Sequence, residues 1–132
     1  MKKTILLVDD EINILDIQNR YLIQAGYDVL VAHDGKEGLE LFRKKSIDLI
    51  ITDIMMPNMD GYDFISEVQY IAPNQPFLFT TAKTSEQDKI YGLSLGADDF
   101  IAKPFSPREL VLRVNNILRR LSRGGETEQI EF

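Results

Sequence analysis

Three acidic side chains follow the first apolar run of the chain, in the segment TILLVDDE of residues 4–11. Asp9, Asp10 and Glu11 come directly after four apolar residues, a run typical of a strand that is buried on both faces. Acids at such a point often cap a helix, which accounts for one or two of them. Clustered carboxylates are also the ligands that a hard divalent cation prefers. The segment alone leaves both interpretations open.

Other short apolar runs also end in residues that can do chemistry. Asp53 follows DLIIT, Thr81 follows PFLFT and Lys103 follows DFIA. Because ligands bind at the carboxyl ends of parallel strands, we expect these side chains to lie together with Asp9 and Asp10. Two carboxylates about 4 Å apart repel by roughly 4 kcal/mol at an effective dielectric near 20, and one ammonium offsets only part of this. We therefore predict a Mg²⁺ site at this edge, with Asp53 as a phosphoryl acceptor.

These residues are positioned by short apolar runs that alternate with longer amphipathic segments. The expected strands are residues 4–8, 28–32, 48–52, 76–80 and 99–102, and the expected helices lie near 12–25, 36–45, 61–71, 84–95 and 107–121. Five strand–helix repeats imply right-handed crossovers and a parallel sheet between helices, an α/β fold. The segment 84–95 is the weakest helix, since Gly92 in its middle costs about 1 kcal/mol relative to alanine. Such a marginal helix is either simply badly optimised or a movable element.

Composition favours one ordinary globular domain of 132 residues, with 44% hydrophobic and 27% charged residues. The 15 basic and 21 acidic residues give a formal net charge of −6, which disfavours direct binding to nucleic acid or anionic membranes. The absence of cysteine excludes disulfides and thiolate chemistry. The apolar run that follows Lys3 is too short for a signal peptide or a membrane span, so we expect a cytoplasmic protein.

Residues 1–121 are expected to form the domain, and residues 122–132 a linker or tail. The tail, SRGGETEQIEF after residue 121, contains two adjacent glycines and several acids, which is typical of a flexible linker. Its last residues, Ile130 to Phe132, alternate like the beginning of a strand. The tail is therefore either a frayed terminus or the first strand of a further domain.

The motifs LLVDDE, LIITDIMMPNMDG, TTAK and GADDFIAKPF resemble those of the receiver domains of two-component response regulators. The resemblance covers residues 4 to about 121 and implies a flavodoxin-like (βα)₅ fold, with a doubly wound parallel five-stranded sheet of order 2-1-3-4-5. It also implies that Asp53 accepts a phosphoryl group from a sensor histidine kinase. The implied ligands of Mg²⁺, or of Mn²⁺ in its place, are Asp10, Asp53 and the backbone carbonyl of Met55, with Asp9 assisting through water.

The same resemblance implies that Thr81 and Lys103 contact the phosphoryl oxygens and that Phe100 is an aromatic switch residue. It implies a cis peptide bond directly after Lys103. Phe100 stands where the family often has tyrosine, so a switch hydroxyl is missing, and an ordinary core aromatic is the alternative interpretation. Met55 and Lys83 occupy positions that tune hydrolysis in the family, and neither offers a carboxylate or amide to orient water. We therefore expect a fairly long-lived phosphorylated form.

A second surface resembles the dimer face of regulators that carry winged-helix DNA-binding domains. The residues of this face are the pairs Lys89 with Glu109, Asp98 with Arg120 and Asp99 with Arg113, together with the apolar Ile90 and Leu93. A solvated charged face is the alternative interpretation. The resemblance implies a homodimer through this face after phosphorylation, and DNA binding only through a C-terminal domain that the 132 residues do not contain.

Two other functions are compatible with the predicted sheet. A metal-dependent phosphatase with an aspartate nucleophile usually needs a second acid nearby, whereas Met55 lies two residues beyond Asp53. A flavin-binding module needs a Gly/Ser/Thr-rich phosphate loop, whereas the DDE segment after the first strand would repel the flavin phosphate. We therefore expect a phosphoacceptor switch without turnover of an external substrate. His33, the only histidine, is expected to be a surface residue.

Overall fold

The protein is described by a computed structural model that covers residues 2–82 and 85–130, with side-chain surroundings described up to residue 122. Five parallel strands form one sheet in the order β2-β1-β3-β4-β5. The strands are β1 (Thr4–Val8), β2 (Asp28–Ala32), β3 (Leu49–Asp53), β4 (Phe77–Thr81) and β5 (Asp99–Ala102). The helices are α1 (Ile12–Gln24), α2 (Gly35–Lys44), α3 (Gly61–Ile71), α4 (Glu86–Ser94) and α5 (Pro107–Ile130). The predicted fold and strand order are confirmed.

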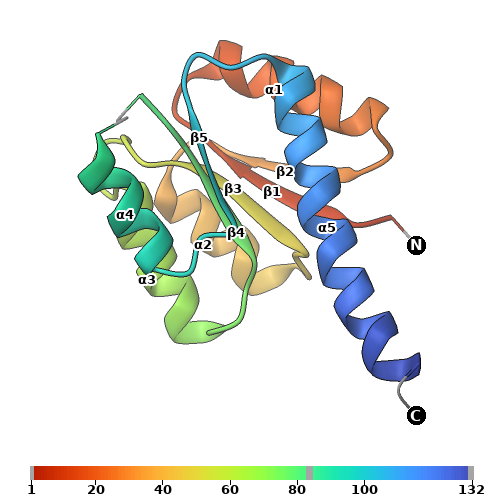
Figure 1. Ribbon diagram of the computed structural model, residues 1–132. Coiled ribbons are helices and arrows are strands. Elements are labelled where there is room, and N and C mark those ends of the chain that lie inside the picture. The colour runs from red at the N-terminus through yellow and green to blue at the C-terminus, as the bar shows by residue number, and fades with distance from the viewer. Residues whose placement is uncertain (1, 83–84, 131–132) are drawn as a thin grey trace.

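Helices cover both faces of the sheet, with α1 and α5 on one side and α2, α3 and α4 on the other (Figure 1). The core is divided accordingly, and alternate residues of β1 belong to different halves of it. Leu6 and Val8 pack in the cluster that includes Phe64 of α3, whereas Ile5 and Leu7 pack in the cluster beneath α1 and α5. A strand buried on both faces explains the uninterrupted apolar run of β1. Among the described residues, no helix combines the length and apolar character needed to cross a membrane.

The predicted elements agree with the structure to within one or two residues, except at the end of α5. That helix continues to Ile130, so the predicted helix end at residue 121 is wrong, while the division into a domain and a linker or tail from residue 122 stays a prediction. Helical hydrogen bonds are local, and the two glycines weaken this segment by about 1 kcal/mol each without the steric block that a proline would impose. A strand does not begin at Ile130, which is helical, and Glu131 and Phe132 lie outside the described residues.

Helix α4 is held by few buried contacts, as its sequence predicts. Among the residues of α4, all of which the structure describes, Gly92 alone is buried. A Cβ atom at Gly92 would lie 3.1 Å from Cδ2 of Phe100, so the missing side chain lets the Phe100 ring pack directly on the helix. The glycine that weakens α4 as an isolated helix therefore also permits its closest approach to β5.

Candidate functional site

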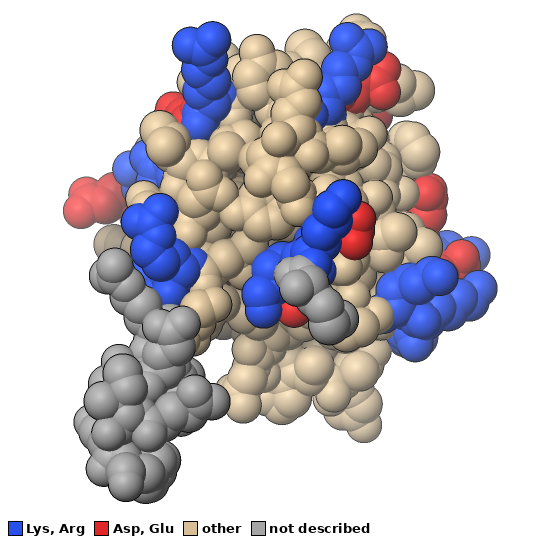
Figure 2. All heavy atoms as spheres, turned by 90° about the vertical axis from the view of Figure 1, so that its right-hand side faces the viewer, with Lys and Arg blue, Asp and Glu red and all other residues tan. Residues whose placement is uncertain are grey.

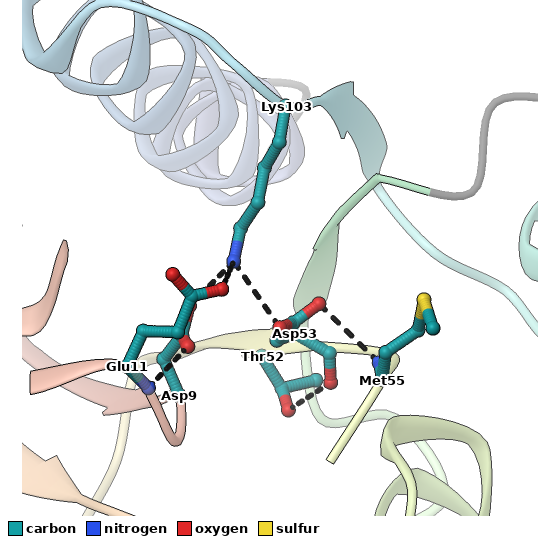
Figure 3. A network of polar contacts seen from close by, with 6 residues as sticks. All are labelled: Asp9, Glu11, Thr52, Asp53, Met55 and Lys103. Carbon is teal, nitrogen blue, oxygen red and sulfur yellow. Dashed lines mark hydrogen bonds and ion pairs between the residues drawn. The ribbon is translucent and has the colours of Figure 1, made fainter.

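Four strands bring the predicted site residues to the carboxyl edge of the sheet (Figure 3). Asp9 directly follows β1, while Asp53 and Thr81 are the last residues of β3 and β4. The backbone N–H of Lys103 donates to the carbonyl of Thr81 at 2.8 Å, which fixes the start of the lysine side chain beside β4. The parallel register thus gathers residues that are up to 94 positions apart in the sequence.

The ammonium of Lys103 lies between two buried carboxylates. Its Nζ donates to Oδ2 of Asp9 at 2.9 Å and to Oδ2 of Asp53 at 3.1 Å. Asp9 is 1% exposed and Asp53 is 3% exposed. Burial lowers the pKa of Lys103, but the hydrogen bonds and charges of the two carboxylates outweigh burial and raise that pKa above its ordinary value. Lys103 is therefore a fixed positive charge at this edge.

The negative charge of the Asp53 carboxylate is less fully compensated by its surroundings than the positive charge of Lys103. Burial raises the pKa of Asp53; Lys103 lowers it in part, and the neighbouring Asp9 raises it again. The backbone N–H of Met55 donates to Oδ1 of Asp53 at 3.3 Å and favours the charged form. Because the pKa stays above its ordinary value, one ammonium does not neutralise the charge that the fold buries here.

Asp10 adds a third carboxylate to Asp9 and Asp53. Each of the three offers an oxygen, and these oxygens all lie within 4.8 Å of one another. Asp10 is exposed while the other two are buried, so the group is open to solvent on one side. Oxygen ligands at a half-open site suit a hard divalent cation that keeps part of its water shell. The cluster can hold a metal ion, which would relieve the repulsion between the acids.

The loop between β3 and α3 packs tightly on the backbone of Asp53. A side chain at Gly61 would collide with the carbonyl oxygen of Asp53, and the N–H of Gly61 donates to the carbonyl of Ile54 at 2.8 Å. Asn58 adopts a left-handed conformation with φ of 70°, which asparagine tolerates better than most residues. The loop therefore supports the end of β3 as well as connecting that strand to α3.

Glu11 and a groove beside the acidic site were not predicted from the sequence. Oε1 of Glu11 lies 3.9 Å from Nζ of Lys103, with the glutamate side chain 59% exposed. The groove, with a volume of about 450 Å³, shares both residues with the acidic site and is mostly apolar. Its other lining residues include Ile14, Ile17, Gln18 and Phe105. The DDE segment could have indicated Glu11, but the groove depends on how α1 meets the segment after β5.

The two predicted switch residues, Thr81 and Phe100, are both buried. Thr81 is 0% exposed, and Phe100 is 8% exposed with its ring centroid 6.5 Å from that of Phe79. Phe100 thus packs in the core here, which matches the alternative interpretation of its position, and its role in switching stays a prediction. The peptide bond after Lys103 is cis, as expected. Lys83 lies outside the described residues.

His33 lies at the start of the β2–α2 connection and is not a member of the acidic cluster. Its side chain is 53% exposed, and its Nδ1 lies 3.3 Å from Oε2 of Glu37. The prediction of a surface histidine is confirmed.

Comparison with known protein families matches residues 5–115 to the response regulator receiver domain. The chain belongs to this family. It is the receiver domain of a two-component response regulator, a signalling switch. The motifs that carried the resemblance therefore identified the family correctly.

Similar proteins are known both as curated sequences and as solved structures. The response regulator SaeR of Staphylococcus epidermidis is 50% identical over 127 residues, which are 96% of this chain and 55% of that protein. SaeR of Staphylococcus aureus is 49% identical over 130 residues, or 97% of this chain and 57% of that protein. The receiver domain therefore spans about half the length of these curated relatives.

Two solved structures show the same fold at lower identity. A CheY-like receiver domain protein from Methanospirillum hungatei has a TM-score of 0.88 at 30% identity, covering 94% of this chain and 99% of that one. The receiver domain of Francisella response regulator 1452 has a TM-score of 0.85 at 36% identity, covering 91% and 99%.

The face formed by α4, β5 and α5 contains the residues predicted for dimerisation. Ile90 and Leu93 of α4 are 60% and 52% exposed. Within this receiver domain Arg113 binds Asp99 at 2.9 Å and Glu109 at 3.0 Å. One expected pair, Asp99 with Arg113, is thus satisfied inside a single chain.

The other two expected pairs are not formed within the described part of one chain, and they remain predictions for a dimer. Oδ2 of Asp98 accepts a hydrogen bond from the N–H of Phe77 at 3.1 Å instead of meeting Arg120. Glu109 contacts Arg113 in place of Lys89. Figure 2 looks onto the side where α5 lies, and there Lys and Arg predominate over Asp and Glu although the chain is net acidic.

Proposed function

We propose that this receiver domain accepts a phosphoryl group from a sensor histidine kinase on Asp53. The observation that carries the proposal is the buried carboxylate of Asp53 at the end of β3, between the ammonium of Lys103 and the N–H of Met55. A carboxylate oxygen of Asp53 forms the new bond to phosphorus while the donor's nitrogen–phosphorus bond breaks. A fixed positive charge and oriented donors favour such a transfer, in which negative charge spreads over the phosphoryl oxygens.

Mg²⁺, with Mn²⁺ as a substitute, is the proposed cofactor. Asp10, Asp53 and the backbone carbonyl of Met55 would hold it, with Asp9 assisting through water. Such an ion supplies charge neutralisation to the phosphoryl oxygens. The group of acidic oxygens within 4.8 Å of one another supports this assignment, because a hard cation prefers such ligands. Lys103 and Thr81 would contact the phosphoryl oxygens.

Phosphorylation is proposed to change the position of α4. The modification replaces the single negative charge of Asp53 with nearly two on the phosphoryl group, a net gain of about one negative charge at the end of β3, and Thr81 and Phe100 would adjust in response. Helix α4 is suited to move because Gly92 is the one buried residue among those of this helix, so few buried contacts hold the helix in place. Moving such a switch from about 1% to about 99% active requires roughly 5.5 kcal/mol of differential stabilisation.

The output is proposed to be homodimerisation through α4, β5 and α5, which controls an attached DNA-binding domain. In this proposal residues 1–121 are the receiver domain, and residues 122–132 lead into that further domain. We further propose a cytoplasmic location and no turnover of an external substrate. We also propose a fairly long-lived phosphorylated form, since the Met55 side chain offers no group that orients water. A generic phosphate ester should therefore give no sustained turnover, whereas steady hydrolysis would indicate a phosphatase.

The central test is phosphorylation by acetyl phosphate or phosphoramidate in Mg²⁺, read by intact mass. The wild-type protein is expected to gain one phosphoryl group, and Asp53→Asn none. Asp34→Asn is the matched control, because Asp34 caps α2 and is not a member of the acidic cluster, so its loss should leave the adduct unchanged. An adduct that persists in Asp53→Asn would contradict the proposal.

The groove beside Lys103 gives a second test, which addresses the kinase. A protein that delivers a phosphoryl group to Asp53 must approach this edge, and apolar contact in the groove would position it. Ile17→Asp should slow transfer from the kinase by roughly tenfold while leaving acetyl phosphate labelling unchanged. Ile23→Asp is the matched control, since Ile23 is equally exposed on α1 but does not line the groove. Equal effects of both substitutions would exclude the groove as the contact.

A further inference from the structure

Met55 differs from the other methionines in its exposure. Among the methionines that the structure describes, Met55 alone is exposed, at 52%, whereas its neighbour Met56 is 8% exposed. Met59 is partly buried against the core cluster that contains Phe64. An oxidant in solution therefore reaches the Met55 thioether before those of Met56 and Met59.

The position of Met55 ties this accessible sulfur to the proposed phosphoacceptor. Its N–H donates to Oδ1 of Asp53 at 3.3 Å, so its side chain leaves the backbone directly beside the acidic cluster. Figure 3 shows the Met55 side chain extending from the strand end on the side to which the Asp53 carboxylate also points. A thioether is only a weak hydrogen-bond acceptor, so Met55 offers little to a water molecule at this place.

We infer that Met55 is an oxidation site through which a peroxide controls the lifetime of the phosphoryl group on Asp53. The inference rests on the proposed function of Asp53. In the modification, a sulfur lone pair attacks one oxygen of hydrogen peroxide, the O–O bond breaks, and the second oxygen leaves as water after proton transfer. The sulfur is oxidised by two electrons to the sulfoxide and the peroxide is reduced, and methionine sulfoxide reductases reverse the change.

The sulfoxide changes what the side chain can do at the site. Its polar oxygen accepts a hydrogen bond strongly, so it can orient a water molecule towards the phosphoryl group that Asp53 carries. One such hydrogen bond corresponds to roughly two- to tenfold in rate. Oxidation is therefore expected to shorten the half-life of phosphorylated Asp53 by roughly two- to tenfold, without any change of fold.

The test treats the whole protein with hydrogen peroxide and maps the added oxygen by peptide mass. Met55 is expected to gain oxygen before Met56 and Met59. The oxidised and untreated proteins are then phosphorylated with acetyl phosphate, the donor is removed, and the half-life of the adduct is followed by intact mass. Met55→Leu should lose the response to peroxide, and Met56→Leu, the matched control, should keep it. Met55→Gln, with an amide oxygen at a similar distance, should shorten the half-life without peroxide.

Each other outcome overturns the inference. Preferential oxidation of Met56 or Met59 would remove the site, and an unchanged or longer half-life after oxidation of Met55 would remove its effect. A response retained in Met55→Leu would place the sensitive residue elsewhere. Lack of any adduct on untreated protein would overturn the proposed function and this inference together, whereas a normal adduct with a lifetime insensitive to oxidation would overturn the inference alone.

Discussion

The carboxyl edge of the sheet and the outer face of α4 and α5 both carry acids beside a basic residue, but they hold them differently. At the edge, Lys103 is paired with Asp9 and Asp53, whose side chains are at most 5% exposed. On the outer face, the side chains of Arg113 and Glu109 are 38% and 43% exposed. Water screens the charges around Arg113, so these ion pairs can exchange partners. The charges around Lys103 are held in place by rigid strand ends. The proposed phosphoryl transfer thus falls where charge is buried, and the proposed dimer contact falls where charge is partly solvated.

Removing the ammonium of the buried group should have the largest effect on stability. Lys103→Met leaves two buried carboxylates without their partner, so we expect a loss of about 3 kcal/mol in the free energy of unfolding in metal-free buffer. Saturating Mg²⁺ should restore part of this loss, since a cation can replace the ammonium. Lys89→Met, on the exposed surface of α4, is the control and should change stability by less than about 0.5 kcal/mol. Urea unfolding measures both, and equal effects would contradict the contrast between the two regions.

Filling the contact between α4 and β5 should have the next largest effect. Gly92→Ala adds about 1 kcal/mol of helix propensity, but its Cβ would press on the Phe100 ring at 3.1 Å. Overpacking costs about 1–3 kcal/mol, so we expect a net loss of about 1 kcal/mol. In a Phe100→Leu background, where the ring is gone, the same substitution should be neutral or stabilising. A double-mutant cycle by urea unfolding checks this, and simple additivity would show that the ring and the glycine are not coupled.

Neutralising Asp53, the proposed acceptor, should increase the stability of the protein in the absence of metal. Burial raises the pKa of Asp53 in the folded state, so this group favours folding at low pH and loses that contribution as the pH rises through the folded pKa. Asp53→Asn should therefore match the wild type in acid and exceed it at neutral pH. We expect a gain of about 1 kcal/mol, because the relieved cost of burying the charge, together with the relieved repulsion from Asp9, exceeds the lost attraction to Lys103. Urea unfolding across pH in a chelating buffer measures the gain, which a pH-independent difference would refute.

Breaking the solvated ion pairs should have the smallest effect. Arg113→Met removes contacts to Asp99 and Glu109 that are partly exposed to water, so we expect a loss of about 0.5 kcal/mol or less. The loss should shrink further at high ionic strength, because exposed charges are screened. A thermal unfolding series in increasing salt checks this prediction. A large, salt-insensitive loss would mean that Arg113 supports the fold in the way that Lys103 does.

Most features set by neighbouring residues were predictable from the sequence, whereas features that depend on contacts between remote segments were not. The strand of Thr4–Val8 was predictable because a run of apolar residues ends at a pair of acids, and the start of α5 because Ser106 and Pro107 mark it. The end of α5 was not, since the glycines signalled a linker while the local hydrogen bonds continued to Ile130. The groove was also unpredictable, because Ile17 and Phe105 meet only after α1 packs.

The order of residues along the chain by itself determined the alternation of strands and helices, and therefore which acids, hydroxyl and lysine lie at one edge of the sheet. Only the tertiary structure decided which charges became partners: Lys103 with Asp9 and Asp53, and Arg113 with Asp99 and Glu109. The physical reason is that periodicity and strand ends are properties of neighbouring residues. The energy of a charge depends on the distance to its partner and on the water between them, and both are set when remote segments pack.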